Sequence, residues 1–231
     1  MKPLFLLFLV FQSAFSEAAC IILLHGLART ENSMTDMQDA LTEQGYKVVN
    51  LGYPSRHYPI EILASKAINR ALASCGSNIE IHFVTHSMGG ILVRQYLDQN
   101  EIPLLNHVVM MAPPNKGSEV VDALGGFLGY KLLNGDAGLQ LGTDENSIPN
   151  TLGSADFDLG IIAGTNSINF ILSSIIPGED DGKVSVKRTR LVGMNDHITM
   201  PVTHTFMMNN KQVISQVIHY LKEGEFKHGD E

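Results

Sequence analysis

The residues with the clearest chemical potential surround Ser87, in the segment 83–90, which reads FVTHSMGG. An apolar run ends there in a tight turn that carries one serine at its apex, with Gly89 and Gly90 close behind it. A serine hydroxyl is a weak nucleophile near neutral pH, so it must stand clear of its backbone and beside a base. The layout is typical of a nucleophile elbow, although Thr85 replaces the first glycine of the G-x-S-x-G pattern. Ser87 is therefore our candidate for covalent catalysis, the alternative being a serine that ends an ordinary strand.

A second motif lies near the start of the chain, where residues 21–27 read IILLHGL. With the serine turn downstream, this short apolar strand ending in His25-Gly26 resembles the alpha/beta-hydrolase superfamily, and within it the small bacterial lipase and esterase branch. The resemblance implies an α/β fold, with a mostly parallel sheet, helices on both faces and a small lid-like insertion. It also implies an oxyanion hole built from the backbone N–H groups of Leu27 and Met88. Each such donor contributes about 3 kcal/mol in comparable sites.

The same resemblance implies an acid after the serine and a histidine after the acid. The segment 178–184 reads GEDDGKV and resembles the Asp-Gly-x-Val turn that carries the acid in bacterial lipases. Asp181 stands directly before the glycine, so we choose it over Asp180. Its carboxylate would accept the imidazole N–H of the base and fix the tautomer. A solvated acidic loop is the alternative.

Nine histidines compete for the role of base. Position favours His197 and His204, which lie between the last predicted strand and the last predicted helix. The segment 201–208, PVTHTFMM, resembles the closing loop of the family, in which the histidine ring reaches back over the serine. We therefore prefer His204 and keep His197 as the alternative. We expect His86 to point to the opposite side of its strand, and His25 to hold the oxyanion turn by hydrogen bonds.

These residues imply a serine hydrolase that cleaves carboxylic esters of neutral, lipid-like acyl groups through Ser87, Asp181, His204 and an acyl-enzyme. The reaction requires no cofactor, and the sequence identifies no metal ligands. An acyltransferase or a thioesterase on the same fold would share these residues and stays open. A non-catalytic binding module is a weaker alternative, because all the parts occur in the expected order.

Length and charge limit the partners. With 231 residues and 44% hydrophobic content, the chain can bury one sizeable core. A net charge of −8 without a Lys/Arg cluster argues against nucleic acid and against docking to an anionic membrane. The absence of basic clusters near the motifs also predicts an uncharged entrance. We expect a small-molecule or lipid ester as substrate, and the oligomeric state is left open.

The amino terminus has the composition of a secretory signal peptide over residues 1–16, with one positive charge, an apolar run and small residues before Glu17. Cleavage as late as residue 19 is the alternative. The apolar run 4–11 is too short to cross a bilayer, so we expect no integral membrane segment after processing. The mature chain, 17–231, would form a single exported domain, periplasmic or secreted.

Strands and amphipathic helices alternate along the chain, which predicts a parallel sheet covered on both faces. The predicted strands are 21–24, 47–51, 79–85, 107–112, 159–163 and 189–192, and the predicted helices are 33–44, 60–75, 89–97 and 211–221. The glycine-rich region of about 115–157 breaks this rhythm. It is interpreted as the insertion, either a lid or wall of the acyl pocket or a surface excursion with its own small core.

The two cysteines stand at the ends of predicted elements. Cys20 opens the first strand and Cys75 closes the helix before the serine strand. In a hydrolase-like sheet those two strands are neighbours, so a disulfide is within reach in an oxidising compartment. Two buried free thiols are the alternative.

Overall fold

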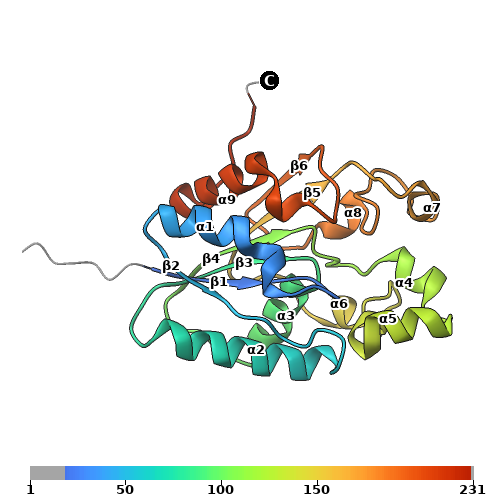
Figure 1. Ribbon diagram of the computed structural model, residues 1–231, viewed down its shortest axis with the longest axis horizontal. Helices are drawn as coiled ribbons and strands as arrows, with labels where there is room; N and C mark the ends of the chain where they lie inside the picture. The colour runs from blue at the N-terminus through green and yellow to red at the C-terminus, as the bar shows by residue number, and fades with distance from the viewer. Residues whose placement is uncertain (1–18, 230–231) are drawn as a thin grey trace, which may run out of the picture.

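The centre of the computed structural model is a six-stranded sheet with the strand order β2-β1-β3-β4-β5-β6, in which every neighbouring pair is parallel (Figure 1). The structure describes residues 19–229, so the predicted signal peptide lies outside the described residues. The strands are β1 (Cys20–Leu24), β2 (Lys47–Asn50), β3 (Ile81–His86), β4 (Leu105–Met111), β5 (Asp158–Gly164) and β6 (Asp196–Met200). This sheet confirms the predicted α/β fold class.

Helices cover both faces of the sheet (Figure 1). Helices α1 and α9 pack on one face, and α2 and α3 pack on the other. The helices are η1 (Glu31–Met34), α1 (Thr35–Glu43), α2 (Ile60–Cys75), α3 (Met88–Leu97), α4 (Glu119–Leu124), α5 (Leu128–Leu139), α6 (Ile148–Thr151), α7 (Phe170–Ser173), α8 (Val186–Thr189), η2 (Met207–Asn209) and α9 (Lys211–Glu223). Because the sheet is covered on both sides, every residue of β1 and β3 is buried, including the polar residues His82, Thr85 and His86 of β3.

The predicted strand 189–192 is wrong. Its first residue ends the one-turn helix α8, which is capped by the Ser185 side chain accepting the N–H of Arg188. The sixth strand is β6, four residues beyond the predicted segment, and it begins with the polar pair Asp196-His197. Because the strand begins with two polar residues, apolar runs in the sequence did not predict it. His197 consequently lies within the last strand rather than after it.

The strand order reverses direction at β1, because β2 lies on one side of it and β3 on the other. In open parallel sheets, such a switch point leaves a crevice at the carboxyl ends of the two central strands, and ligands bind there. Leu27 follows β1 and Ser87 follows β3. The two predicted halves of the site therefore leave the sheet at the same place.

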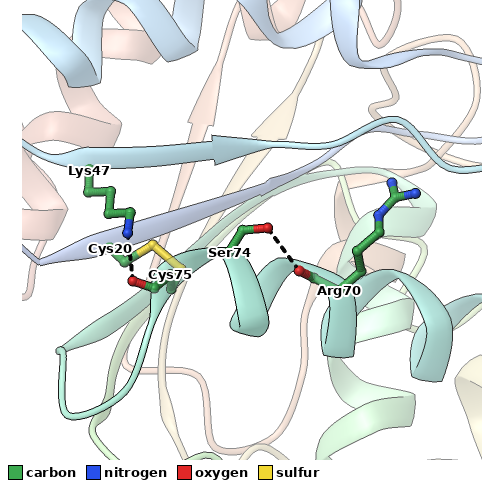
Figure 2. The surroundings of a disulfide bond; sticks show 5 residues. All are labelled: Cys20, Lys47, Arg70, Ser74 and Cys75. Carbon is green, nitrogen blue, oxygen red and sulfur yellow. Dashed lines mark hydrogen bonds between the residues drawn. A yellow bond between two sulfur atoms is a disulfide. The ribbon is translucent and has the colours of Figure 1, made fainter.

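The two cysteines form a disulfide, which decides between the two alternatives that the sequence left open. Cys20 at the start of β1 and Cys75 at the end of α2 have Cα atoms 5.7 Å apart. In the adjoining strand β2, Lys47 donates from Nζ to the Cys75 carbonyl at 2.7 Å (Figure 2). The crosslink and this hydrogen bond hold the amino-terminal edge of the sheet to the helix that covers it.

The segment 115–157 lies between β4 and β5 and contains the short helices α4, α5 and α6. Arg94, buried on α3, anchors the two ends of this insertion. Its guanidinium donates to the carbonyl oxygens of Asn115, Pro149, Leu152 and Gly153. Burial lowers the pKa of Arg94 to about 10, so the group stays charged at neutral pH. The helix that begins beside Ser87 is thereby tied to the insertion.

Among residues 19–229, no helix has both the length and the apolar character needed to cross a bilayer.

Candidate active site

Ser87 sits at the apex of a strained turn between β3 and α3. Its φ of 55° and ψ of −123° lie in a region that residues other than glycine rarely adopt. Gly89 allows the start of α3 to approach β1, because a Cβ there would stand 2.5 Å from the Leu24 carbonyl oxygen. Thr85 is fully buried in β3 at the position where the usual motif has glycine. The turn is thus formed without the first glycine of the motif.

Ser87, His204 and Asp181 are brought together in one hydrogen-bonded chain. The imidazole of His204 has Nδ1 2.7 Å from Asp181 Oδ2 and Nε2 3.0 Å from Ser87 Oγ. A carboxylate can only accept, so Nδ1 carries the proton and Nε2 accepts from the serine hydroxyl. All three side chains are buried. This is the geometry in which a histidine can remove a proton from a serine.

The second oxygen of Asp181 is fixed by its own turn. Oδ1 accepts the backbone N–H groups of Lys183 and Val184 at 3.0 and 2.9 Å. The backbone N–H of His204 donates to the backbone carbonyl oxygen of Asp181 at 3.0 Å. Its neighbour Asp180 instead accepts from the Ser173 hydroxyl and the Gly182 N–H. The carboxylate that reaches the imidazole is therefore that of Asp181.

The expectation that His86 points to the opposite side of its strand is wrong, because its side chain lies against the candidate site. Its Nε2–H donates to the His204 carbonyl at 2.9 Å, and the two rings lie 4.8 Å apart. Burial, reinforced by the neighbouring His204, lowers the pKa of His86 well below its usual value, so the ring is neutral. Gly26 makes room for it, since a Cβ there would stand 2.8 Å from Nδ1. The reversal of the backbone at Ser87 brings this ring under the His204 loop, which strand alternation alone could not predict.

The alternative base, His197, is engaged elsewhere. Its Nε2 lies 3.0 Å from Thr189 Oγ1, which already donates to the Val186 carbonyl and therefore accepts from the imidazole. Burial lowers the pKa of His197 to about 4. Within the described residues, His197 forms no hydrogen bond to Ser87 or Asp181.

The turn after β1 is held from below by His25 and Tyr53, whose rings stack at 3.9 Å. His25 accepts the Tyr53 N–H at Nε2, and the Tyr53 hydroxyl donates to the His25 carbonyl, as expected for a histidine that holds this loop. Within residues 19–229, the backbone N–H groups of Leu27 and Met88 donate to no protein acceptor. Two free amides beside the serine match the arrangement of an oxyanion hole.

A cavity of about 310 Å³ opens beside Ser87 and His204. One wall is apolar and comes from the insertion, through Val120, Val121, Leu124, Tyr130, Leu133 and Leu141. Arg29 and Lys183 also line this cavity. The expectation of an uncharged entrance is therefore wrong. Each of these basic residues stands two positions after a predicted site residue, and this spacing was the signal that the sequence analysis missed.

Across residues 19–229, no group of three or more His, Cys, Asp or Glu side chains is placed to hold a metal ion.

Comparisons with known proteins give structural neighbours only. No protein-family model and no curated protein matches the chain. The mature lipase BlEst2 of Bacillus licheniformis is similar over 88% of this chain and 92% of its own, at 20% identity and a TM-score of 0.69. Lipase B of Aspergillus fumigatus is similar over 92% of this chain and 54% of its own, at 18% identity and a TM-score of 0.65. The esterase RhEst1 of a Rhodococcus species is similar over 89% of this chain and 91% of its own, at 15% identity and a TM-score of 0.57.

These likenesses, together with the parallel sheet and the turn at Ser87, show that the chain has the alpha/beta-hydrolase fold.

Proposed function

We propose that the protein is a serine hydrolase that cleaves carboxylic esters with neutral, lipid-like acyl groups. The observation that carries this proposal is the hydrogen-bonded chain from Ser87 through His204 to Asp181, in which Ser87 and His204 line a partly apolar cavity. The lipases and esterase among the structural neighbours support the choice of an ester as substrate.

In the proposed mechanism, His204 Nε2 takes the proton of Ser87 as Oγ forms a bond to the ester carbonyl carbon. The negative charge that develops on the carbonyl oxygen is stabilised by the N–H groups of Leu27 and Met88. The imidazolium, held by Asp181, then gives its proton to the leaving alcohol as the ester C–O bond breaks. Water attacks the acyl-enzyme with the same histidine as base, which frees the acid and restores Ser87.

The volume of the cavity supports an acyl chain of limited length. Its volume of about 310 Å³ is near the lower end of the roughly 300–1,000 Å³ range of ligand pockets. Helices α5 and α7 line the cavity through Tyr130, Leu133 and Leu172. The same two helices carry the exposed apolar side chains Leu128, Leu132 and Phe170, each more than 80% exposed. Apolar surface of this kind suits an apolar acyl chain, which gains free energy when it is buried there. That the insertion opens as a lid remains a prediction.

Export to the periplasm or the medium is part of the proposal. The disulfide between Cys20 and Cys75 supports it, because such bonds persist mainly in oxidising compartments. The predicted signal peptide over residues 1–16 supports it independently.

Labelling with a fluorophosphonate probe, mapped by mass spectrometry, tests the proposed nucleophile. We expect the probe on Ser87, and no labelling of the Ser87→Ala variant. Ser118 is the matched control, since it also lines the cavity but donates its hydroxyl to the Lys183 carbonyl. Labelling that persists in Ser87→Ala, or that disappears only in Ser118→Ala, would contradict the assignment.

A further inference from the structure

Arg29 and Lys183, here called the basic pair, line the same cavity as Ser87 and His204. We infer that the basic pair binds a phosphate monoester on the leaving alcohol of the substrate. This inference rests on the proposed ester hydrolysis and names the class of alcohol that the site selects.

The basic pair is positioned by the catalytic turns themselves. Lys183 follows Asp181 by two residues, and its backbone is held at both ends, by its N–H on Asp181 Oδ1 and by its carbonyl on the Ser118 hydroxyl. Arg29 follows Leu27 by two residues, and its N–H donates to the Gly26 carbonyl. A group bound by both side chains would therefore lie close to the scissile ester.

Neither member of the basic pair has an acidic partner. Within residues 19–229, no carboxylate oxygen lies within 4.0 Å of either charged group, whereas Arg188 nearby is paired with Glu119. Among the described residues, both cations line one cavity without a carboxylate partner within 4.0 Å, in a chain whose net charge is −8. A bound anion would satisfy both.

The two charges are close enough to oppose each other. Lys183 is exposed, yet partial desolvation by the surrounding protein lowers the pKa of its ammonium group; the positive charge of Arg29 lowers it further and the Asp181 carboxylate raises it. A phosphate monoester carries a charge of about −1.5 to −2 at neutral pH, which matches two cations better than a single carboxylate does. Binding it would relieve the repulsion between them.

The apolar wall decides which end of the ester carries the phosphate. All six apolar wall residues named above come from the segment 120–141 of the insertion, and the basic pair comes from the two turns that follow β1 and Asp181. An acyl chain gains by burial against the insertion. The charged end of the molecule is then the alcohol.

The first test compares kcat/KM for two soluble esters, 1-hexanoylglycerol 3-phosphate and 1-hexanoylglycerol. We expect the phosphorylated ester to be favoured by on the order of tenfold or more, since charge-assisted hydrogen bonds to a phosphate are among the stronger polar contacts. An oleoyl pair in mixed micelles distinguishes the sources of the phosphate. Preference only in the oleoyl pair identifies a lipid headgroup, and preference in both pairs identifies any phosphorylated alcohol. Equal rates within both pairs would overturn the inference while leaving ester hydrolysis intact.

Variants assign the preference to the basic pair. Arg29→Met and Lys183→Met should each lower the ratio of the two kcat/KM values by on the order of tenfold, whereas Lys183→Arg should retain most of it. Lys187→Met is the matched control, because Lys187 is exposed on α8, lies outside the cavity and changes the net charge equally. A ratio that falls as much in Lys187→Met as in Lys183→Met would also overturn the inference.

A binding measurement keeps the inference testable if neither ester is hydrolysed. Calorimetry on the Ser87→Ala protein should show hexyl phosphate binding at least tenfold more tightly than hexanol, and Arg29→Met in that background should remove the difference. Absence of turnover with this binding preference would contradict the proposed function alone. Equal binding of the two compounds would contradict the basic pair as a phosphate site.

Discussion

Replacing Asp181 with Asn should inactivate the site through the tautomer of His204. In the native chain, Asp181 Oδ1 accepts two backbone N–H groups and Oδ2 accepts the imidazole N–H. An asparagine has one oxygen, and keeping it on the two backbone donors turns its NH₂ toward His204 Nδ1. The imidazole then carries its proton on Nε2 and cannot accept one from Ser87.

The opposite orientation of the asparagine is costly. Its NH₂ would face the N–H groups of Lys183 and Val184, and each buried donor left without an acceptor costs about 1–3 kcal/mol. A minimum of about 2 kcal/mol for the two leaves the productive orientation at roughly one part in thirty. The variant also lacks the negative charge that stabilises the imidazolium. We therefore expect kcat to fall by on the order of 10³ to 10⁴.

The assay is the steady-state hydrolysis of p-nitrophenyl butyrate, with circular dichroism to verify that the variant is folded. Asp180→Asn is the matched control, because it is the same substitution one residue away. The Asp180 side chain accepts hydrogen bonds from Ser173 and Gly182 and none from His204. We expect this control to retain most of its activity. If Asp180→Asn were as inactive as we expect of Asp181→Asn, and Asp181→Asn remained active, the assignment of the acid would be refuted.

Four further predictions concern the cavity, the disulfide and His197. Across p-nitrophenyl esters of increasing chain length, kcat/KM should rise by up to about fourfold per methylene, since each contributes roughly 0.8 kcal/mol, and then level off; a flat profile or a preference for an anilide would contradict the acyl pocket. Reduction of Cys20–Cys75, whose separation is 55 residues, should lower the free energy of unfolding in urea by roughly 4 kcal/mol on the loop-entropy model, and an unchanged midpoint after full reduction would contradict it. His197→Gln should keep its esterase activity, and an inactive variant would make His197 the base instead. Because burial holds the pKa of native His197 at about 4, the unfolded chain binds more protons below pH 6.5, so the free energy of unfolding should fall as the pH drops from 6.5 toward 4. Urea titrations at pH 7 and pH 5 should show a smaller fall in the variant than in the native protein.

The sequence predicted most of the sheet because its strands are short apolar runs between clear helices. β1 was identifiable because a central parallel strand is buried on both faces and reads as continuous hydrophobic sequence. β3 is only half apolar in sequence and was identified together with the serine turn that follows it. β6 was missed for the opposite reason. Asp196 and His197 open it with polar side chains, and Asp196 accepts the Phe226 N–H from a segment far along the chain.

The parts of the candidate site that lie in short local sequence motifs could be predicted. Ser87, Asp181 and His204 each lie in a short turn with a recognisable sequence, and the structure brings these three together. The orientation of His86 depends on a backbone reversal and on a contact with a residue 118 positions away. A local reading of the strand could not supply it.

The basic pair was missed because clustering was sought along the chain and not in space. Arg29 and Lys183 are separated by most of the sequence, and only the fold brings their two turns to one cavity. Both basic residues are visible in the sequence two positions after a predicted site residue, Arg29 after Leu27 and Lys183 after Asp181.

The central claim is that Ser87 forms an acyl-enzyme, and trapping that species tests it most directly. The protein is mixed with a p-nitrophenyl ester, quenched in acid within the first turnover, digested and analysed by mass spectrometry. We predict that the peptide containing Ser87 gains the mass of the acyl group, and that His204→Ala accumulates none on this time scale. Release of p-nitrophenol with no acyl group on Ser87, or with the acyl group on another residue, would contradict the account.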